Sequence, residues 1–143
     1  MKSSKIVVAG LVGGIMFFFL GWLFYGILLM DFMMASTGSA SGVQKEMPDF
    51  IPLIAGNLTW GIFYSVIFGQ FANIRNASDG AKLGAIMGFF ISLSYDLIMY
   101  GTTNIMMFNM LVTDVIVTII MSTITGAVIG KLLGRKPEHI IKD

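Results

Sequence analysis

Four long apolar segments separated by short polar stretches make up most of the chain. They cover roughly residues 6–30, 50–72, 81–101 and 107–133. A helix rises about 1.5 Å per residue, so about 20 residues cross a hydrocarbon core about 30 Å thick. Because lipid satisfies no backbone hydrogen bonds, the pattern predicts an all-α, polytopic membrane protein, a bundle of four transmembrane helices in a single domain over residues 1–143.

The breaks between these segments have the residues expected at helix ends. Asp49 is a candidate N-cap for the second helix, and Ser78 or Asp79 for the third. The small and polar residues at positions 35–42 predict a flexible first loop. Each apolar segment is therefore expected to be one separate helix.

The composition supports a membrane location. Hydrophobic residues form 56% of the chain and charged residues 12%, and the mean hydropathy is +0.85. An average soluble domain has about 25% charged residues. The absence of cysteine excludes disulfides, thiol catalysis and thiolate metal sites. We expect a lipid bilayer around the protein, no cofactor and no nucleic-acid partner.

The basic residues fall on one side of the predicted bundle, and only Lys45 falls on the other. Cytoplasmic loops are enriched in basic residues, so both termini are expected to be cytoplasmic. The first apolar segment exceeds the about 7 to 15 residues of a cleaved signal and is expected to remain as a helix. The basic residues on the cytoplasmic side are Lys2, Lys5, Arg75, Lys82, Lys131, Arg135, Lys136 and Lys142.

Small and polar residues recur at every fourth position of the last two segments. Residues four apart lie on neighbouring turns of one helix surface. In an antiparallel pair, this spacing sets Asp96 opposite Asp114, and small side chains let the backbones approach closely. The residues expected to pack the two helices together are Gly84, Gly88, Ser92, Thr118, Ser122, Gly126 and Gly130.

Two carboxyl groups are predicted at one depth in the outer third of the bundle. Asp96 lies about 21 Å along its helix from Lys82, and Asp114 lies about 10 Å from Met107. Asn57 reaches a similar depth on the second helix. The predicted site is an outward-facing polar pocket whose ligand-binding residues are Asp96, Asp114, Asn57, Tyr95 and, at its mouth, Asp31.

Acidic residues inside a membrane are costly and usually functional. No Lys, Arg or His lies near them in the apolar segments, so the counter-charge would be a proton, a bound cation, a basic ligand or a group on another chain. A structural alternative is that both acids are protonated and hold helices together by hydrogen bonds. Eight of the twelve Met residues lie near the outer face, where they either bind Cu(I) or fill space; the identity of any metal stays open.

The preferred interpretation is a membrane protein that binds a small cation, a proton or a small basic ligand, a function compatible with transport. The alternative is an accessory or assembly subunit of a larger membrane complex. Exposed glycines on the first two helices would support that role, and a homo-oligomer is also expected. The first-helix aromatic residues Phe17, Phe18, Phe19, Trp22, Phe24 and Tyr25 are expected to face lipid or a partner.

The second half of the chain carries a recurring pattern. Residues 84–88 read Gly-Ala-Ile-Met-Gly, residues 95–97 read Tyr-Asp-Leu and residues 101–103 read Gly-Thr-Thr, with an Asp seven residues into the last helix. This stretch resembles small four-helix bacterial membrane proteins classed as of unknown function. The resemblance implies the four-helix fold and a multi-pass location in a bacterial inner membrane.

The aspartate pair also allows a lesser alternative, an intramembrane aspartyl hydrolase. Phe108-Asn109 before Asp114 is similar to the final motif of the lipoprotein signal peptidases, a four-helix family with an aspartate dyad. Here two more residues separate that pair from the aspartate. Tyr95-Asp96 resembles the first catalytic motif of presenilin-like proteases, but their Gly-x-Gly-Asp motif is missing.

Overall fold

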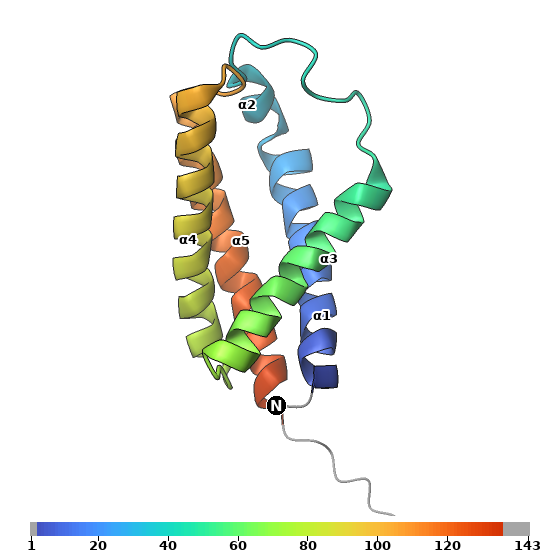
Figure 1. Cartoon of the computed structure of the whole chain (residues 1–143). Coiled ribbons are helices and arrows are strands. Elements are labelled where there is room, and N and C mark those ends of the chain that lie inside the picture. The colour runs from blue at the N-terminus through green and yellow to red at the C-terminus, as the bar shows by residue number, and fades with distance from the viewer. Residues whose placement is uncertain (1–2, 136–143) are drawn as a thin grey trace, which may run out of the picture.

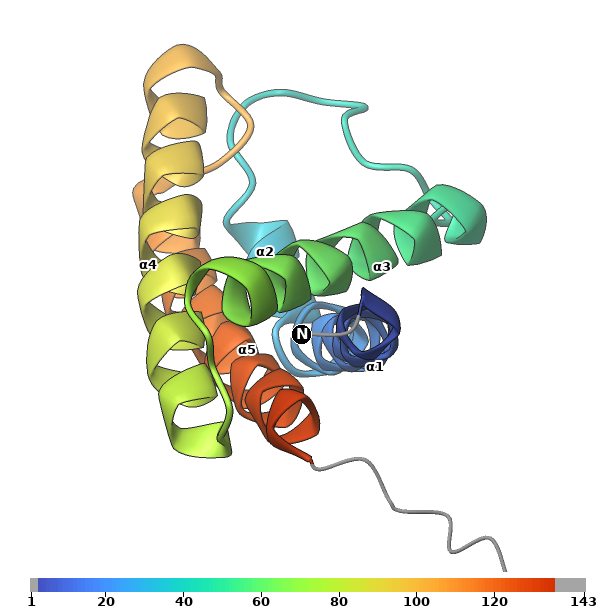
Figure 2. The same cartoon turned by 60° about the horizontal axis from the view of Figure 1, so that its bottom comes forward.

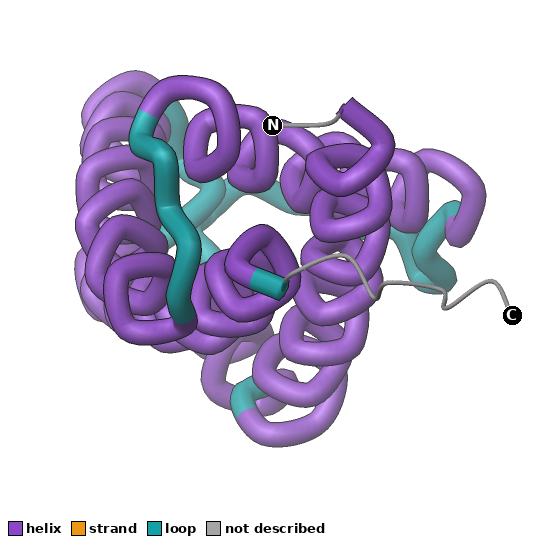
Figure 3. Tube along the Cα trace, turned by 90° about the horizontal axis from the view of Figure 1, so that it is seen from below, coloured by secondary structure: helices purple, strands orange, loops and turns teal. Residues whose placement is uncertain are grey.

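The computed structural model describes residues 3–135, which form helices joined by loops (Figures 1 and 3). Within this part the only β-type pairing is an isolated antiparallel bridge between Thr37 and Met106. Four helical stretches are long and apolar enough to cross a membrane, namely Ser3–Leu28, Phe50–Phe71, Ala77–Thr102 and Phe108–Gly134. The predicted all-α class and the four candidate spanning helices are confirmed; Lys2, Lys136 and Lys142 lie outside the described residues.

Two of the spanning stretches change their helical form before they end. Helix α1 (Ser3–Gly21) continues as the π-helical segment η1 (Trp22–Leu28), and α3 (Phe50–Val66) continues as η2 (Ile67–Phe71). The other helices are α2 (Met30–Ala35), α4 (Ala77–Thr102) and α5 (Phe108–Gly134). A π turn closes its hydrogen bonds over five residues and so redirects the side chains that follow.

The N-cap of the third spanning helix differs from the prediction. The helix begins at Ala77, and the Asn76 side chain accepts a 2.8 Å hydrogen bond from the Asp79 N–H. The Asn76 amide also donates to the Asp79 carboxylate at 2.7 Å. Asn76 is therefore the N-cap, and Asp79 is its hydrogen-bond partner. Neither predicted residue, Ser78 or Asp79, occupies the cap position itself. Asp49 precedes α3, but its side chain pairs with Lys45 and makes no cap bond.

Helices α4 and α5 form an antiparallel pair with their backbones in contact (Figure 1). A methyl group added to Gly88 would lie 2.7 Å from Ser122 Cβ, and one added to Gly84 would collide with the Ser122 carbonyl. Gly126 in turn faces the backbone of Gly80. Only glycine allows this approach, so the register of the two helices is fixed by where the small residues occur.

Helices α1 and α3 form a second close pair. A methyl group on Gly14 would lie 2.6 Å from Leu58 Cα, and one on Gly10 would lie 2.7 Å from Ile62 Cα. Gly61 lies against the backbone of Gly14. These three glycines therefore serve packing within the chain, whereas Gly26 and Gly56 on the same two helical stretches are exposed.

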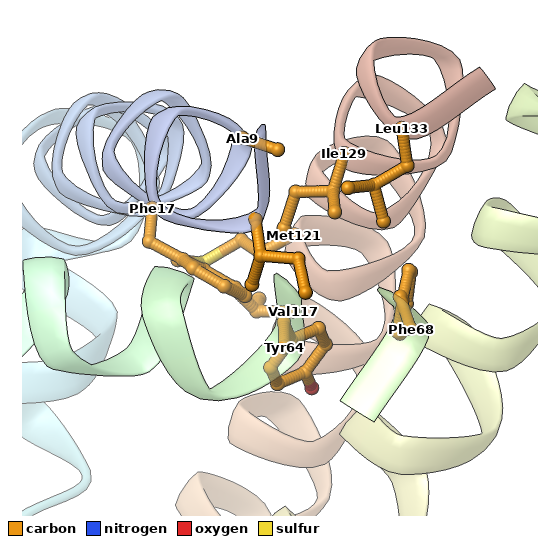
Figure 4. Close-up of a cluster of buried hydrophobic side chains, with 9 residues drawn as sticks. Ala9, Phe17, Tyr64, Phe68, Val117, Met121, Ile129 and Leu133 are labelled. Carbon is orange, nitrogen blue, oxygen red and sulfur yellow. The ribbon is translucent and has the colours of Figure 1, made fainter. Parts of the chain in front are cut away.

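The buried core joins the two pairs in the half of the bundle that contains the N-terminus (Figure 4). Helix α1 also packs against α5, and side chains from α1, α3, η2 and α5 interlock there. Phe17 meets Tyr64 edge to face, with ring centroids 5.2 Å apart. The core residues are Ile6, Ala9, Phe17, Tyr64, Phe68, Val117, Met121, Ile129 and Leu133. Phe17 is thus a core residue, contrary to its expected lipid-facing position.

Helix α3 crosses the bundle obliquely, and its Phe50 end lies away from α4 and α5 (Figures 1 and 2). Its last turns reach α5, where Tyr64 and Phe68 are buried. Its first turns are exposed and support few contacts with the other helices. The end of the bundle farther from the start of α1 is therefore built mainly from η1, α2, α4 and α5.

Candidate functional site

Asp96 and Asp114 face each other where α4 and α5 meet, within hydrogen-bond reach of one another. Two hydroxyl groups, from Tyr25 and Thr118, lie beside these two carboxyl groups. The Tyr25 hydroxyl, on η1, donates a 2.7 Å hydrogen bond to Asp114 Oδ1. The Thr118 hydroxyl, one turn further along α5, donates a longer bond of 3.4 Å to Asp114 Oδ2. We call these four residues the acid cluster.

The two carboxyl groups have unequal surroundings. Both oxygens of Asp114 accept a hydroxyl hydrogen bond, as a carboxylate requires. Asp96 is only 3% exposed, and its Oδ2 has no hydrogen-bond partner among residues 3–135. A buried polar atom without a partner costs free energy. Asp96 is therefore the member of the pair whose carboxyl group is left with an unsatisfied oxygen in this part of the chain.

Asp96 is buried because its helix approaches α5 so closely. It lies one turn beyond Ser92 on the α4 face that carries Gly84 and Gly88. The Ser92 hydroxyl bonds to the Gly88 carbonyl at 2.7 Å and so stays on its own helix. The close packing of these small residues against α5 thus brings Asp96 against Asp114.

The other residues predicted for the site are not brought to the acids. The Asn57 side chain donates a 2.8 Å hydrogen bond to the Leu53 carbonyl of its own helix. It lines a groove on α3 together with Pro52, Leu53, Gly56, Thr59 and Trp60. Tyr95 is 61% exposed, and Asp31 is exposed in the first turn of α2. Of the five ligand-binding residues predicted from the sequence, the acid cluster therefore contains only Asp96 and Asp114.

Tyr25 is the site residue that the sequence interpretation missed. The apolar pattern predicts that it faces lipid or a partner together with five other aromatic residues, of which Phe19 and Trp22 are indeed exposed. One signal did distinguish it, because Tyr25 is the only residue with a hydroxyl group between Ile6 and Met30. The π-helical turns of η1, which the apolar pattern does not reveal, set the direction of this side chain.

The bundle is closed on the side of the acids that leads toward the N-terminus. The Tyr64 hydroxyl donates to Ser122 Oγ at 3.0 Å, and the Ser65 hydroxyl donates to the Ile6 carbonyl at 2.7 Å. Thr125 is also buried there, and its hydroxyl has no hydrogen-bond partner within the described part of the chain. Beyond them the core side chains Phe68, Ile129 and Leu133 are fully buried. Buried side chains therefore pack the bundle between the acids and that end.

The chemistry available to the acid cluster is that of oxygen ligands. Two carboxyl groups and two hydroxyl groups suit a proton or a hard cation. Among residues 3–135, no group of three or more His, Cys, Asp or Glu side chains could hold a metal ion. The arrangement therefore favours a site with at most two charged ligands.

Comparison of the chain with protein-family models, with curated proteins and with solved structures found no match in any of the three.

Proposed function

We propose that the protein is a multi-pass membrane protein that binds a small cation or a proton between Asp96 and Asp114. The observation that supports this most is that the two carboxyl groups face each other within hydrogen-bond reach. Two acids at this distance repel when both are ionised, and the repulsion is strong in a medium of low dielectric constant. A single positive charge between them removes that repulsion.

The absence of a basic side chain strengthens the proposal. No Lys, Arg or His occurs between residues 83 and 130, or between residues 6 and 44. The acid cluster therefore has no counter-charge from its own helices. Tyr25 and Thr118 donate hydrogen bonds to Asp114, but hydroxyl groups are neutral and leave the charge uncompensated.

Binding is the function proposed, and transport by a single chain is not included. The glycines of α4 and α5 hold the backbones together below the acids, and the core fills the space between α1, η2 and α5. A path across the membrane would need a rearrangement of this packing or a second copy of the chain. We further propose, from the distribution of basic residues, that both termini are cytoplasmic and that the acids lie toward the opposite side.

Two alternatives remain. An accessory subunit loses part of its support, because Gly10, Gly14 and Gly61 pack within the chain. One requirement of an aspartyl hydrolase is met, because its two catalytic carboxyl groups must lie close together. It also needs room for water and a scissile bond, and Asp96 is 3% exposed. Cation binding without turnover distinguishes the proposed function from both alternatives, because neither a subunit nor a hydrolase requires a bound cation.

The direct test is calorimetric titration of the purified protein with Na⁺, K⁺, Li⁺, Ca²⁺ and small organic ammonium ions. The proposal expects saturable heat for one class of ion, and loss of that heat in Asp96→Asn and in Asp114→Asn. The matched control is Asp31→Asn, which removes an exposed carboxyl near the same end of the bundle. Equal binding in all four proteins would refute the proposal.

A further inference from the structure

The outer loop that follows α2 is tied to the loop between α4 and α5 by several bonds. The Met107 N–H donates to the Ser36 carbonyl at 2.9 Å, and the Ala40 N–H donates to the Asn104 carbonyl at 3.0 Å. Between them lies the antiparallel bridge of Thr37 and Met106. We call residues Ser36–Ala40 the strap, because they join the α2 side of the bundle to the outer ends of α4 and α5.

The strap is anchored by a side chain as well as by the backbone. Asn109 donates a 2.9 Å hydrogen bond to the Ser36 hydroxyl, and Ser36 is buried at 2% exposure. Gly38 lies directly against the Asn104 carbonyl, where a larger residue would collide. A buried serine and a closely packed glycine therefore lie within a loop that the sequence predicted to be flexible. Such burial indicates a specific contact.

The anchor lies above the acid cluster on the same helix. Asn109 precedes Asp114 by five residues, which corresponds to about 7.5 Å along α5. Thr102, the last residue of α4, follows Asp96 by six residues, or about 9 Å. Figure 1 shows α2 and the α4–α5 loop together at this end of the bundle. The strap thus crosses the end of the bundle nearest to the acids.

The chain also connects the strap to the cluster directly. Tyr25 belongs to η1, and α2 follows after Leu29, whose φ of −116° and ψ of 7° are not helical. The Leu29 N–H still bonds to the Phe24 carbonyl at 2.8 Å. A break of this kind between two short helical segments can act as a hinge. Movement of α2 about Leu29 would displace the strap relative to the segment that holds Tyr25.

We propose that the strap is a lid that closes the acid cluster on its outer side and must lift for a cation to reach the buried Asp96. This inference rests on the proposed function, since it describes access to the same site. It follows from two observations together: the core closes the opposite side, and the strap bonds bridge the near side. Exchange of the bound cation is then limited by strap opening.

The test uses the lack of cysteine in the chain. Residues paired across an antiparallel bridge have Cα atoms about 4.5 to 5.5 Å apart, within the range of a disulfide. Thr37→Cys/Met106→Cys is oxidised to lock the strap. The purified protein is then treated with a water-soluble carbodiimide and an amine, and labelling of Asp96 and Asp114 is followed by peptide mass spectrometry. Labelling of exposed Glu46 serves as the internal control.

The expected result is a fall of about tenfold or more in labelling of the buried Asp96 in the oxidised protein, because the open state is a minor one. Reduction should restore the rate, and Glu46 should label equally in both forms. Equal rates for Asp96 in the locked and reduced proteins would overturn the lid. If labelling is gated but no cation binds, the lid stands and the binding proposal fails.

A second variant covers the case in which the disulfide does not form. Asn109→Ala removes the bond to Ser36 and should speed labelling by about fivefold, the factor for a bond worth about 1 kcal/mol. The matched control is Thr102→Val at the end of α4, whose hydroxyl bonds to the Ile98 carbonyl of its own helix. No difference between these two variants would also overturn the lid.

Discussion

Tyr25 and Asp114 are joined by a 2.7 Å hydrogen bond that crosses from the first spanning helix to the last. Asp114 in turn faces Asp96 on α4, so three of the four spanning helices meet at one point. The fourth, α3, contributes to the core instead of to this cluster. The bond therefore links the α1–α3 pair to the acids of the α4–α5 pair.

Tyr25→Phe should weaken both stability and cation binding. The variant keeps the aromatic ring and removes only the donor to Asp114 Oδ1. Hydrogen bonds between helices in a membrane are worth about 0.6 to 2 kcal/mol, which sets the expected loss in unfolding free energy. The measurement is equilibrium unfolding in mixed micelles. Tyr95→Phe is the control, since Tyr95 is exposed, and a loss as large in that variant would show that Tyr25 has no special part.

Gly84→Leu should separate α4 from α5 and disrupt the acid cluster. The added side chain would collide with the Ser122 carbonyl, and overpacking of this kind typically costs about 1 to 3 kcal/mol. Circular dichroism should still show helices, while the thermal unfolding temperature falls. Gly101→Leu is the control, because nothing lies within 4 Å of its added carbon atom. Similar unfolding temperatures for the two variants would contradict the close backbone contact.

The position of the two acids could be predicted from the sequence because it depends on spacing. Residues four apart share a helix face, and an antiparallel pair with small residues has one close register. This reasoning set Asp96 opposite Asp114. It could not exclude Asn57, because depth along a helix says nothing about the tilt that carries the first turns of α3 away from the acids (Figure 2).

The partners of the acids were harder to predict. Tyr25 reaches Asp114 from a π-helical segment, and the periodicity of an ordinary helix does not describe its direction. The strap was interpreted as a flexible loop because its residues are small and polar. Its bonds to Met107 and Asn109 depend on how α2 folds back, and that arrangement arises from contacts far apart in the chain.

The orientation of the bundle in the membrane can be tested with single cysteines. Ser41→Cys lies in the loop before α3, and Ser78→Cys lies near the start of α4; both positions are exposed. The distribution of basic residues predicts that a membrane-impermeant thiol reagent labels only Ser41→Cys in intact cells. Labelling should extend to Ser78→Cys after permeabilisation. The opposite pattern would invert the proposed topology.

Asp96→Asn and Asp114→Asn should leave insertion and folding intact. An amide has nearly the same size as a carboxyl and carries no charge, so each variant relieves the repulsion within the pair. Both proteins should be recovered from membranes at the yield of the unaltered protein and should lack a cation response. Failure of either variant to insert would instead assign the acids a structural part in assembly.

The central claim is that a positive charge between Asp96 and Asp114 stabilises the folded protein. The most direct measurement is the thermal unfolding temperature of the purified protein with and without each cation of the panel, and on acidification, compared with Asp96→Asn/Asp114→Asn. A ligand at one hundred times its dissociation constant adds about 2.7 kcal/mol of stability. We predict a higher unfolding temperature with one class of cation or with acid, and no such rise in the double variant. Identical responses of the two proteins would contradict the account.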